Sequence, residues 1–278
     1  MTVLALTSAK GAPGVTTAAL ALTLAWPKPV LLVEADTSGS SSVLAGYMGG
    51  RVPHDRSIVG LVRATRAGQS LDDALWRLVY PLDENPAGAS RGLLAAPQDA
   101  AQAASLRGLW PSLPALWRRV GEQHGVDVIV DAGRLGSANE PSALLDEADL
   151  TLIVTRTSLP DIAALAARLE ALPALTMPDG REVPKLHLLL VGEGRPYTGR
   201  EIGHRIPVPI AAALPQDSRA AAVLSHGASA GAGFPSSSLM RSAVATAHRL
   251  DALAVRRRAL LTPNATTRTE QTEISRAQ

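Results

Sequence analysis

Short, unbroken runs of apolar residues alternate with helix-like segments along most of this 278-residue chain. Such runs are typical of strands covered on both faces, because a strand with one face in water alternates apolar and polar residues. Strands that alternate with helices form a parallel sheet with helices packed on both sides. The sequence therefore predicts an α/β fold with a doubly wound, mostly parallel sheet.

The pattern assigns most of the chain to one domain. The expected strands are residues 2–8, 30–33, 92–96, 126–131, 150–155, 186–191 and 208–214. Helices are expected over residues 15–26, 57–68, 70–78, 98–124 (with breaks near Pro111 and Pro114), 159–172, 217–225 and from about 238 to 261. Beyond Thr262 the composition turns polar without an apolar period. We expect one domain over residues 1–261 and a disordered polar tail over 262–278.

Composition excludes several classes of protein. With no cysteine, the chain has no disulfide framework, thiolate metal site or cysteine nucleophile. Aromatic residues are only 3% of the chain, whereas nucleic-acid-binding faces usually combine basic and aromatic side chains, so sequence-specific DNA binding is disfavoured. The first residues lack the basic region of a signal peptide, and the uncharged stretch over residues 11–27 is short for a bilayer. These features predict a cytoplasmic protein.

The positive charge is concentrated near the end of the chain. Residues 241–278 hold seven arginines, including Arg256, Arg257 and Arg258 at the end of the last expected helix. A basic helix end is favoured by the helix dipole and stays in solvent, or it rests on an anionic membrane surface. The solvated end is the preferred interpretation, and peripheral contact with the inner face of the membrane stays open.

Glycines and acidic residues stand where three expected strands end. The loop Lys10-Gly11-Ala12-Pro13-Gly14-Val15-Thr16-Thr17 follows the first strand, Asp36 follows the second, and Asp131 ends the strand 126–131. In an open parallel sheet, ligands bind at the carboxyl ends of the strands. Backbone N–H groups at a helix N-terminus can hold a phosphate, and a nearby carboxylate can reach a phosphate-bound Mg²⁺. These positions together predict a nucleotide-type site.

These motifs, in this order, resemble the MinD/ParA family of P-loop ATPases, whose deviant Walker A loop reads K-G-G-x-G-K-[ST]. The resemblance covers about residues 1–261 and implies ATP or ADP with Mg²⁺ as ligands. It implies catalytic roles for Lys10, the signature lysine that reaches a partner's nucleotide across a homodimer, and for Asp36, which orients the attacking water. Thr16 and the Walker B residue Asp131 are implied to hold the metal. The implied nucleotide-binding residues are Gly11, Ala12, Pro13, Gly14, Val15, Thr16, Thr17, and Pro215 and Asp217 of a turn similar to the family's adenine-contacting P-x-D.

The loop departs from the family pattern in ways that affect its chemistry. Val15 stands where the family has the lysine that touches the β- and γ-phosphates. Ala12 replaces a glycine, and Pro13 removes one backbone donor. Further along, Glu34 replaces the usual Asp and Gly192 replaces the frequent base-reading Asn. These changes predict weakened nucleotide binding and weakened or lost hydrolysis.

Three functions are therefore open. The preferred one is a dimeric positioning or partitioning factor, or a localisation factor of a pilus or secretion system similar to the TadZ/CpaE-like proteins, that acts through a protein partner with weakened or lost ATP hydrolysis. A second is an active ATPase, in which Asp36 orients water and Lys10 stabilises the transition state in trans. A third is a nucleotide-free scaffold of the same fold, which Pro13 and Val15 favour.

Overall fold

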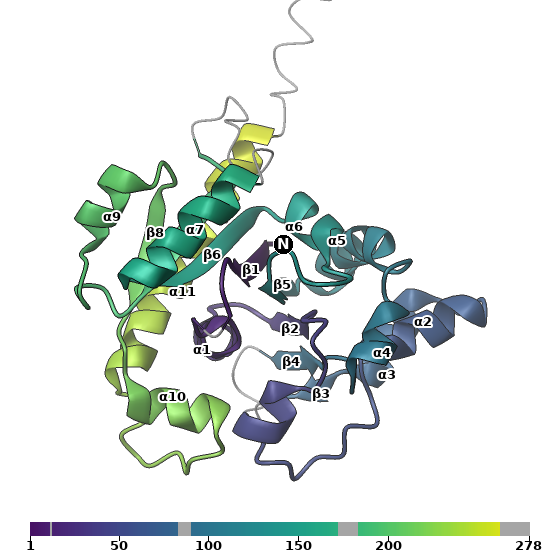
Figure 1. The fold of residues 1–278 in the computed structure, drawn as a ribbon. Helices are drawn as coiled ribbons and strands as arrows, with labels where there is room; N and C mark the ends of the chain where they lie inside the picture. The colour runs from purple at the N-terminus through teal and green to yellow at the C-terminus, as the bar shows by residue number, and fades with distance from the viewer. Residues whose placement is uncertain (12, 83–89, 172–182, 262–278) are drawn as a thin grey trace, which may run out of the picture.

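The described part of the chain, residues 1–11, 13–82, 90–171 and 183–261 of a computed structural model, contains one eight-stranded sheet (Figure 1). Its order is β3-β4-β2-β5-β1-β6-β7-β8, and neighbouring strands are parallel except for β3 and β4. The strands are β1 (Val3–Ser8), β2 (Val30–Glu34), β3 (Tyr80–Pro81), β4 (Arg91–Leu94), β5 (Asp127–Arg134), β6 (Leu150–Arg156), β7 (Leu186–Val191) and β8 (Ile210–Leu214). The predicted doubly wound parallel sheet is confirmed. The expected tail, 262–278, lies outside the described residues.

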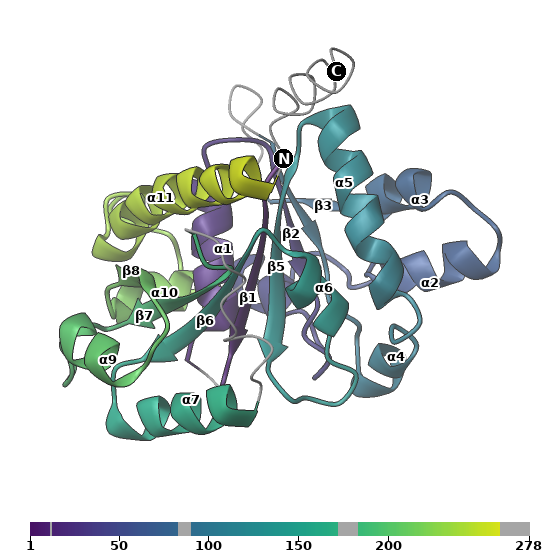
Figure 2. The same cartoon turned by 90° about the horizontal axis from the view of Figure 1, so that it is seen from above.

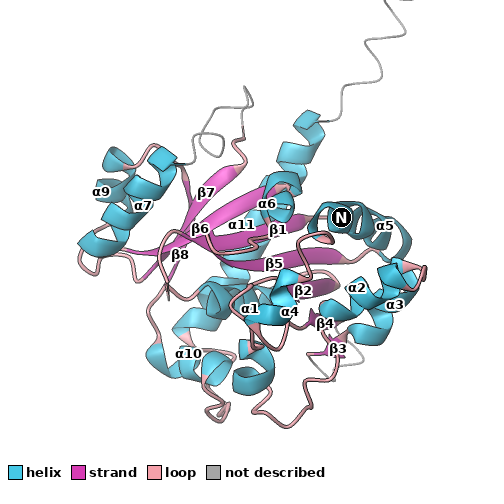
Figure 3. Cartoon of the chain, turned by 45° about the vertical axis from the view of Figure 1, so that its right-hand side comes forward, coloured by secondary structure: helices cyan, strands magenta, loops and turns pink. Residues whose placement is uncertain are grey.

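Helices cover both faces of the sheet (Figures 2 and 3). One face packs against α1 (Val15–Ala25), the π-helical turn η1 (Val43–Tyr47), α10 (Ser218–Ser225) and α11 (Ser238–Leu261). The other packs against α2 (Val59–Arg66), α3 (Leu71–Leu78), the 3₁₀ turn η2 (Trp110–Ser112), α5 (Leu113–His124), α6 (Ser142–Glu147), α7 (Leu159–Ala171) and α9 (Gly199–Arg205), while the short α4 (Ala100–Ala104) lies at the edge of that layer. The sheet is therefore enclosed between two helical layers.

The two layers explain why the strands carry apolar residues on both faces. In β1, Leu4 and Leu6 belong to the core under α1 and α11, whereas Ala5 belongs to the core on the opposite face. Leu31 and Leu32 of β2 divide between the two cores in the same way, and each is at most 1% exposed. Successive side chains of a strand point to opposite faces, so a strand buried on both faces needs an apolar residue at each position.

The region over residues 98–124 differs from the expected single broken helix. It forms α4, η2 and α5, and its interruption lies at residues 105–109, before both prolines. Pro111 lies within the 3₁₀ turn, and Pro114 lies in the first turn of α5. A proline in the first turn removes only an N–H that has no partner within the helix, so Pro114 begins a helix where we expected a break.

Two short helices and an edge strand escaped the sequence analysis. β3 has only two residues and pairs antiparallel with β4, so it carries no periodic signal. α6 and α9 are also too short for an apolar period. At the start of α9, however, Thr198 and Glu201 form a capping box, in which the Glu201 carboxylate accepts from the Thr198 N–H at 2.8 Å. The T-x-x-E pattern was the available signal for this helix.

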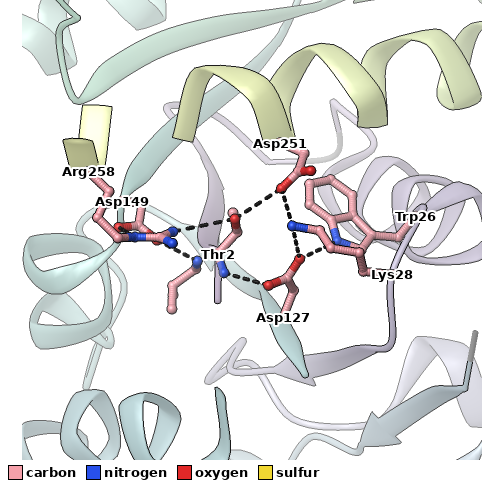
Figure 4. Close-up of polar contacts among 8 residues, drawn as sticks. Thr2, Trp26, Lys28, Asp127, Asp149, Asp251 and Arg258 are labelled. Atoms are coloured by element: carbon pink, nitrogen blue, oxygen red, sulfur yellow. Dashed lines mark hydrogen bonds and ion pairs between the residues drawn. The ribbon is translucent and has the colours of Figure 1, made fainter. Parts of the chain in front are cut away.

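A polar network at the amino end of the sheet joins β1, β5 and α11 (Figure 4). The buried Asp127 carboxylate accepts hydrogen bonds from the Thr2 backbone N–H at 2.5 Å and from the Trp26 indole Nε1 at 2.9 Å. Lys28 Nζ lies 3.0 Å from Asp127 and 2.6 Å from Asp251 of α11. Every polar atom of Asp127 that faces this network therefore has a donor or a cation beside it.

The basic end of α11 contributes to the same region. Arg258 donates to Asp149 at 2.7 Å, and Arg257 is 5% exposed and donates to the Val183 carbonyl at 2.6 Å. The expectation of a solvated helix end is therefore wrong for these two residues, because both guanidiniums bond to the body of the domain. None of the helices in the described ranges combines the length and apolar character that crossing a bilayer requires.

Candidate functional site

The loop between β1 and α1 lies between two strands that both pair with β1, namely β5 and β6. Gly14 is the N-cap of α1 and adopts a φ of 101°, in the left-handed region that favours glycine. No side chain caps this helix, so the N–H groups of its first turn face outward without a side-chain acceptor. The turn thus presents backbone donors and the positive end of the helix dipole to an anion.

Thr16 and Asp131 meet directly behind this turn. The Thr16 hydroxyl donates to Asp131 Oδ2 at 2.5 Å, and the Gly133 N–H donates to Asp131 Oδ1 at 3.0 Å. Asp131 is 1% exposed, and burial, together with the negative charge of Asp36, raises its pKa to about 6. No cation from the described residues lies beside this buried carboxylate, and together with the Thr16 hydroxyl it forms an oxygen-donor pair of the kind that Mg²⁺ prefers.

Asp36 lies against Gly133 across the end of the sheet. A Cβ at Gly133 would stand 2.5 Å from Asp36 Cγ, and Gly133 itself has a φ of 64°. Only glycine therefore fits this position without moving the Asp36 side chain. The Asp36 carboxylate also accepts from the Ser38 N–H at 2.9 Å. The sequence analysis selected Asp36 but missed the glycine that makes room for it.

Glu34 organises the segment after β2. Its side chain is buried and accepts hydrogen bonds from the Ser41 hydroxyl, from the Val43 N–H at 3.2 Å and from the Ala96 N–H at 3.3 Å. Burial, opposed by these hydrogen bonds and reinforced by the charge of Asp131, raises the Glu34 pKa to about 7. Glu34 does not line the cavity described next, so its part is to position backbone around the site.

A cavity of about 740 Å³ opens at the carboxyl ends of the strands. It is bordered on one side by the loop and first turn of α1, and on the other by the turn after β8. The predicted site residues that line it are Gly11, Pro13, Gly14, Val15, Thr16, Thr17, Asp36, Pro215 and Asp217. Asp131 lies behind Thr16, and Ala12 is outside the described residues. The tertiary structure therefore brings nearly all of the predicted positions to one place.

The Lys10 side chain points toward Asp161 of α7 and not into the cavity. Its Nζ lies 3.6 Å from Asp161 Oδ1 at the start of α7, and its side chain is 51% exposed. It is not among the residues that line the cavity. In a single chain, the ammonium group of Lys10 is thus directed away from the phosphate loop and remains accessible from outside.

The Val15 side chain packs in the hydrophobic core and also borders the cavity. It is 7% exposed and packs with the residues of α1 and the adjoining sheet face, while part of it borders the cavity. This apolar environment suits valine. The position from which the family's lysine reaches phosphate therefore supplies no cation here.

The turn after β8, which borders the cavity opposite the loop before α1, is held in place by hydrogen bonds of its own. Asp217 caps α10, accepting from the Ala220 N–H at 3.0 Å and from the Ser238 hydroxyl at 2.7 Å, and these bonds lower its pKa. Gln216 lines the cavity and lies over Gly192, where an added Cβ would stand 3.2 Å from Gln216 Oε1. The sequence analysis missed Gln216, although it stands inside the predicted turn.

Two arginines also line the cavity and were missed. Arg134 is the last residue of β5 and Arg156 is the last residue of β6. Their position directly after an apolar strand was the available signal, because residues at the carboxyl ends of parallel strands face the ligand crevice. Ser225 at the end of α10 and His226 directly after it border the same cavity and had no comparable signal.

Comparison with known proteins supports this architecture at the level of structure. No family model matches the sequence, and no curated protein sequence matches it. A ParA family ATPase from Chlorobium tepidum superposes with a TM-score of 0.66 at 19% identity, covering 89% of this chain and 98% of that one. MinD from Pyrococcus horikoshii in complex with Mg-ADP gives 0.65 at 17% identity, covering 92% and 98%. MinD in the MinC:MinD complex from Aquifex aeolicus gives 0.65 at 17% identity, covering 91% and 96%.

The superpositions extend over nearly the whole length of these proteins. At these identities the likeness concerns the fold. The chain has the MinD/ParA-type P-loop fold.

Proposed function

We propose that this chain binds a magnesium-complexed adenine nucleotide in the cavity beside α1 and acts as a dimeric positioning factor with weakened ATP hydrolysis. The observation that carries the proposal is the contact between the Thr16 hydroxyl and Asp131, 2.5 Å apart, at the uncapped N-terminus of α1. It joins a hydroxyl and a buried carboxylate at the one end of the sheet where backbone donors are also free for a phosphate.

The residues present fit a hydrated Mg²⁺ with phosphate ligands. Mg²⁺ is usually held by one or two protein oxygens together with waters and phosphate oxygens, which matches a site built from Thr16 and Asp131. When bound, the ion would neutralise phosphate charge and polarise the phosphoryl group. The absence of a compensating cation beside Asp131, within the residues described, also fits a carboxylate that waits for a metal.

The nucleotide would lie along the cavity. Gly11, Pro13, Gly14 and the first turn of α1 would face the phosphates, and Pro215 and Asp217 would stand at the base end. The cavity volume of about 740 Å³ lies within the range of small-molecule sites. In Pyrococcus horikoshii MinD, a protein of the same fold, the bound ligand is Mg-ADP. We extend that ligand class to this chain as part of the proposal.

Val15 is the reason to propose weakened hydrolysis. Positive groups placed on the transferring phosphoryl group are a main source of rate in such enzymes, and the loop supplies none from this buried position. Asp36 keeps a second candidate in view, because it lines the cavity and is anchored by the Ser38 N–H, where it could orient water. An active Mg-ATPase is therefore the alternative function, and Asp36→Ala would abolish its phosphate release.

Lys10 supports the proposed dimer. Its contact with Asp161 is an exposed pair at 3.6 Å, and such pairs contribute about 0 to 1 kcal/mol. The ammonium group can leave this contact for the phosphates of a second copy at little cost. Beyond the dimer, we propose a protein partner, in positioning or in pilus or secretion assembly; MinD of Aquifex aeolicus forms a complex with MinC. We place the protein in the cytoplasm or at the inner membrane face.

The test is calorimetric titration of the full chain with Mg-ATP and Mg-ADP. We expect binding by the native protein and loss of magnesium-dependent binding in Thr16→Ala. Thr65→Ala is the matched control, because Thr65 is a helical threonine in α2 whose hydroxyl donates to Leu61 rather than to a site residue. If neither nucleotide binds the native protein, the nucleotide-free scaffold replaces the proposal.

The same samples test the dimer by light scattering. We expect Mg-ATP to shift the native protein from monomer to dimer and to leave Lys10→Ala monomeric. Arg66→Ala, an exposed basic residue of α2 away from the cavity, is the control. A Lys10→Ala protein that still dimerises with Mg-ATP would remove Lys10 from the proposed mechanism.

A further inference from the structure

Two cationic side chains border the cavity without belonging to any recognised motif. Arg134 ends β5 and Arg156 ends β6, and both line the same cavity as the loop 11–17. β5 and β6 are the two neighbours of β1. The arginines therefore stand on opposite sides of the loop that follows β1, and Arg134 is paired in register with Ser8, the residue at which β1 ends.

The alternation of side chains along β6 places Arg156 on the same face of the sheet as α1. Leu152 and Val154 of β6 pack in the core under α1 and α11, whereas Ile153 packs on the opposite face. Because side chains alternate along a strand, Arg156 belongs to the α1 side, as Leu152 and Val154 do. This is the side on which Asp131 of β5 meets Thr16. The loop is thus flanked by a carboxylate from one neighbouring strand and a guanidinium from the other.

Neither guanidinium makes a hydrogen bond or ion pair with any residue that the structure describes. The two carboxylates that line the cavity, in contrast, are engaged: Asp36 accepts from the Ser38 N–H, and Asp217 accepts from Ala220 and Ser238. Positive charge in the cavity is therefore left without a partner while negative charge is bonded to the protein. An anionic ligand is what such a cavity favours.

Elsewhere, arginines of this chain do find partners. Arg119 makes three hydrogen bonds to Asp72, and Arg258 pairs with Asp149. The guanidinium is a rigid fork whose parallel N–H groups match two phosphate oxygens, and it remains charged at every physiological pH. Two such groups facing a phosphate loop that has lost its lysine at Val15 supply the missing charge from different strands.

We propose that Arg134 and Arg156 bind the phosphate groups of the nucleotide in place of the P-loop lysine. This inference rests on the proposed function, because it names which side chains hold the ligand of that same site. It assigns the charge of the missing lysine to the ends of β5 and β6, so that the P-loop contributes mainly backbone N–H groups. The apolar residue at position 15 is then compatible with tight binding.

The experiment compares Mg-ATP, Mg-ADP and AMP binding to the native protein, Arg134→Ala, Arg156→Ala and the double variant by calorimetry. Because a hydrogen bond to a charged group contributes about 1.5 to 3 kcal/mol, we expect each single variant to weaken Mg-ATP binding about tenfold or more. The loss for AMP should be smaller than for Mg-ATP, since fewer phosphates are contacted. Equal losses for AMP and Mg-ATP would overturn the assignment to the terminal phosphates.

Two further variants keep the result interpretable. Arg66→Ala is the matched control, and Val15→Lys in the double variant restores the charge from the loop and should recover Mg-ATP binding. Because neither arginine has a described partner, thermal unfolding of the apo variants should match that of the native protein. Native-like Mg-ATP binding by the double variant would overturn this inference alone, whereas absence of binding by the native protein would overturn the proposed function and this inference with it.

Discussion

Asp127 is the first residue of β5, at the amino end of the sheet, and Asp131 lies four residues further along the strand, toward the carboxyl end of the sheet. Each is 1% exposed, yet their surroundings are opposite. Asp127, at the amino end, faces the Lys28 ammonium at 3.0 Å and two N–H donors. Asp131, at the carboxyl end, meets a hydroxyl and one N–H, with no described cation in contact and with the charge of Asp36 nearby. The same side chain thus stabilises the fold at one end and is left in an unfavourable charged state at the other.

The contrast extends to the cations. At the amino end, Lys28 lies between Asp127 and Asp251, and these carboxylates raise its pKa despite the opposing effect of burial. At the carboxyl end, Arg134 and Arg156 have no described partner. A protein can remove uncompensated charge by pairing it, as the amino end shows. The charges left apart at the carboxyl end are the basis of the proposal that these arginines contact a ligand.

Replacing a carboxylate by a neutral amide should lower the stability of the protein most at the amino end of the sheet. Asp127→Asn leaves Lys28 without its buried partner and places an amide against the Thr2 and Trp26 donors. We expect a loss of about 3 kcal/mol in the free energy of unfolding, measured with urea at pH 7, because one of two buried N–H donors loses its acceptor and the attraction to the Lys28 ammonium is removed. Asp146→Asn, at an exposed side chain of α6, is the control; equal stability of the two variants would contradict this account.

Ionisation of Glu34, near the carboxyl end of the sheet, should lower the stability of the protein as pH rises. The folded pKa of Glu34, about 7, lies above its unfolded value of about 4.3, so the folded state retains the proton longer and loses relative stability between those two pH values. The effect amounts to about 3 kcal/mol. In urea unfolding at pH 4, 5, 6, 7 and 8, Glu34→Gln should remove the part of this slope above pH 6, whereas the raised pKa of Asp131, about 6, keeps a slope below it. Glu170→Gln, an exposed carboxyl of α7, should keep it. A flat profile in the native protein would rule the mechanism out.

The equivalent substitution at Asp131, further along β5, should act in the opposite direction on stability. Asp131 has a folded pKa of about 6, above the unfolded value of about 3.9, so at pH 8 its ionised form disfavours folding and Asp131→Asn should stabilise the apo protein by about 1 to 2 kcal/mol. The same variant should bind Mg-ATP at least about tenfold more weakly, because a carboxylate at the metal is lost. Urea unfolding and calorimetry measure the two effects. Destabilisation comparable to that of Asp127→Asn would erase the contrast between the two ends.

The smallest effect on stability is expected at Lys10. Its pair with Asp161 is exposed, at 3.6 Å, so Lys10→Ala should change the unfolding free energy by less than about 0.5 kcal/mol. Any change should disappear in high salt, which screens exposed charges. The measurement is urea unfolding of the monomer at two salt concentrations, with Arg66→Ala beside it. A loss of more than about 1 kcal/mol would show that the Lys10–Asp161 pair holds the loop after β1 to the start of α7.

The site could be predicted to the extent that it follows the chain locally. The loop around Gly14, together with Asp36 and Asp131, is readable because each position directly follows an apolar strand, and parallel strands bring such positions to one edge. The space at Gly133 that admits Asp36, and the placement of Arg134 and Arg156 on either side of the loop, depend on which strands are neighbours. Strand order is a long-range property that apolar periodicity does not contain.

By itself, the sequence determined that this chain forms a doubly wound parallel sheet with a glycine-containing loop between the first strand and the first helix, because burial on both faces and helix-starting glycines leave direct marks on local composition. Only the tertiary structure decided which charges are paired. Asp127 and Asp131 read alike along β5, but one lies beside Lys28 and α11 while the other lies beside Thr16 and an open cavity. The physical reason is that the energy of a buried charge depends on its neighbours in space, and those neighbours come from distant parts of the chain.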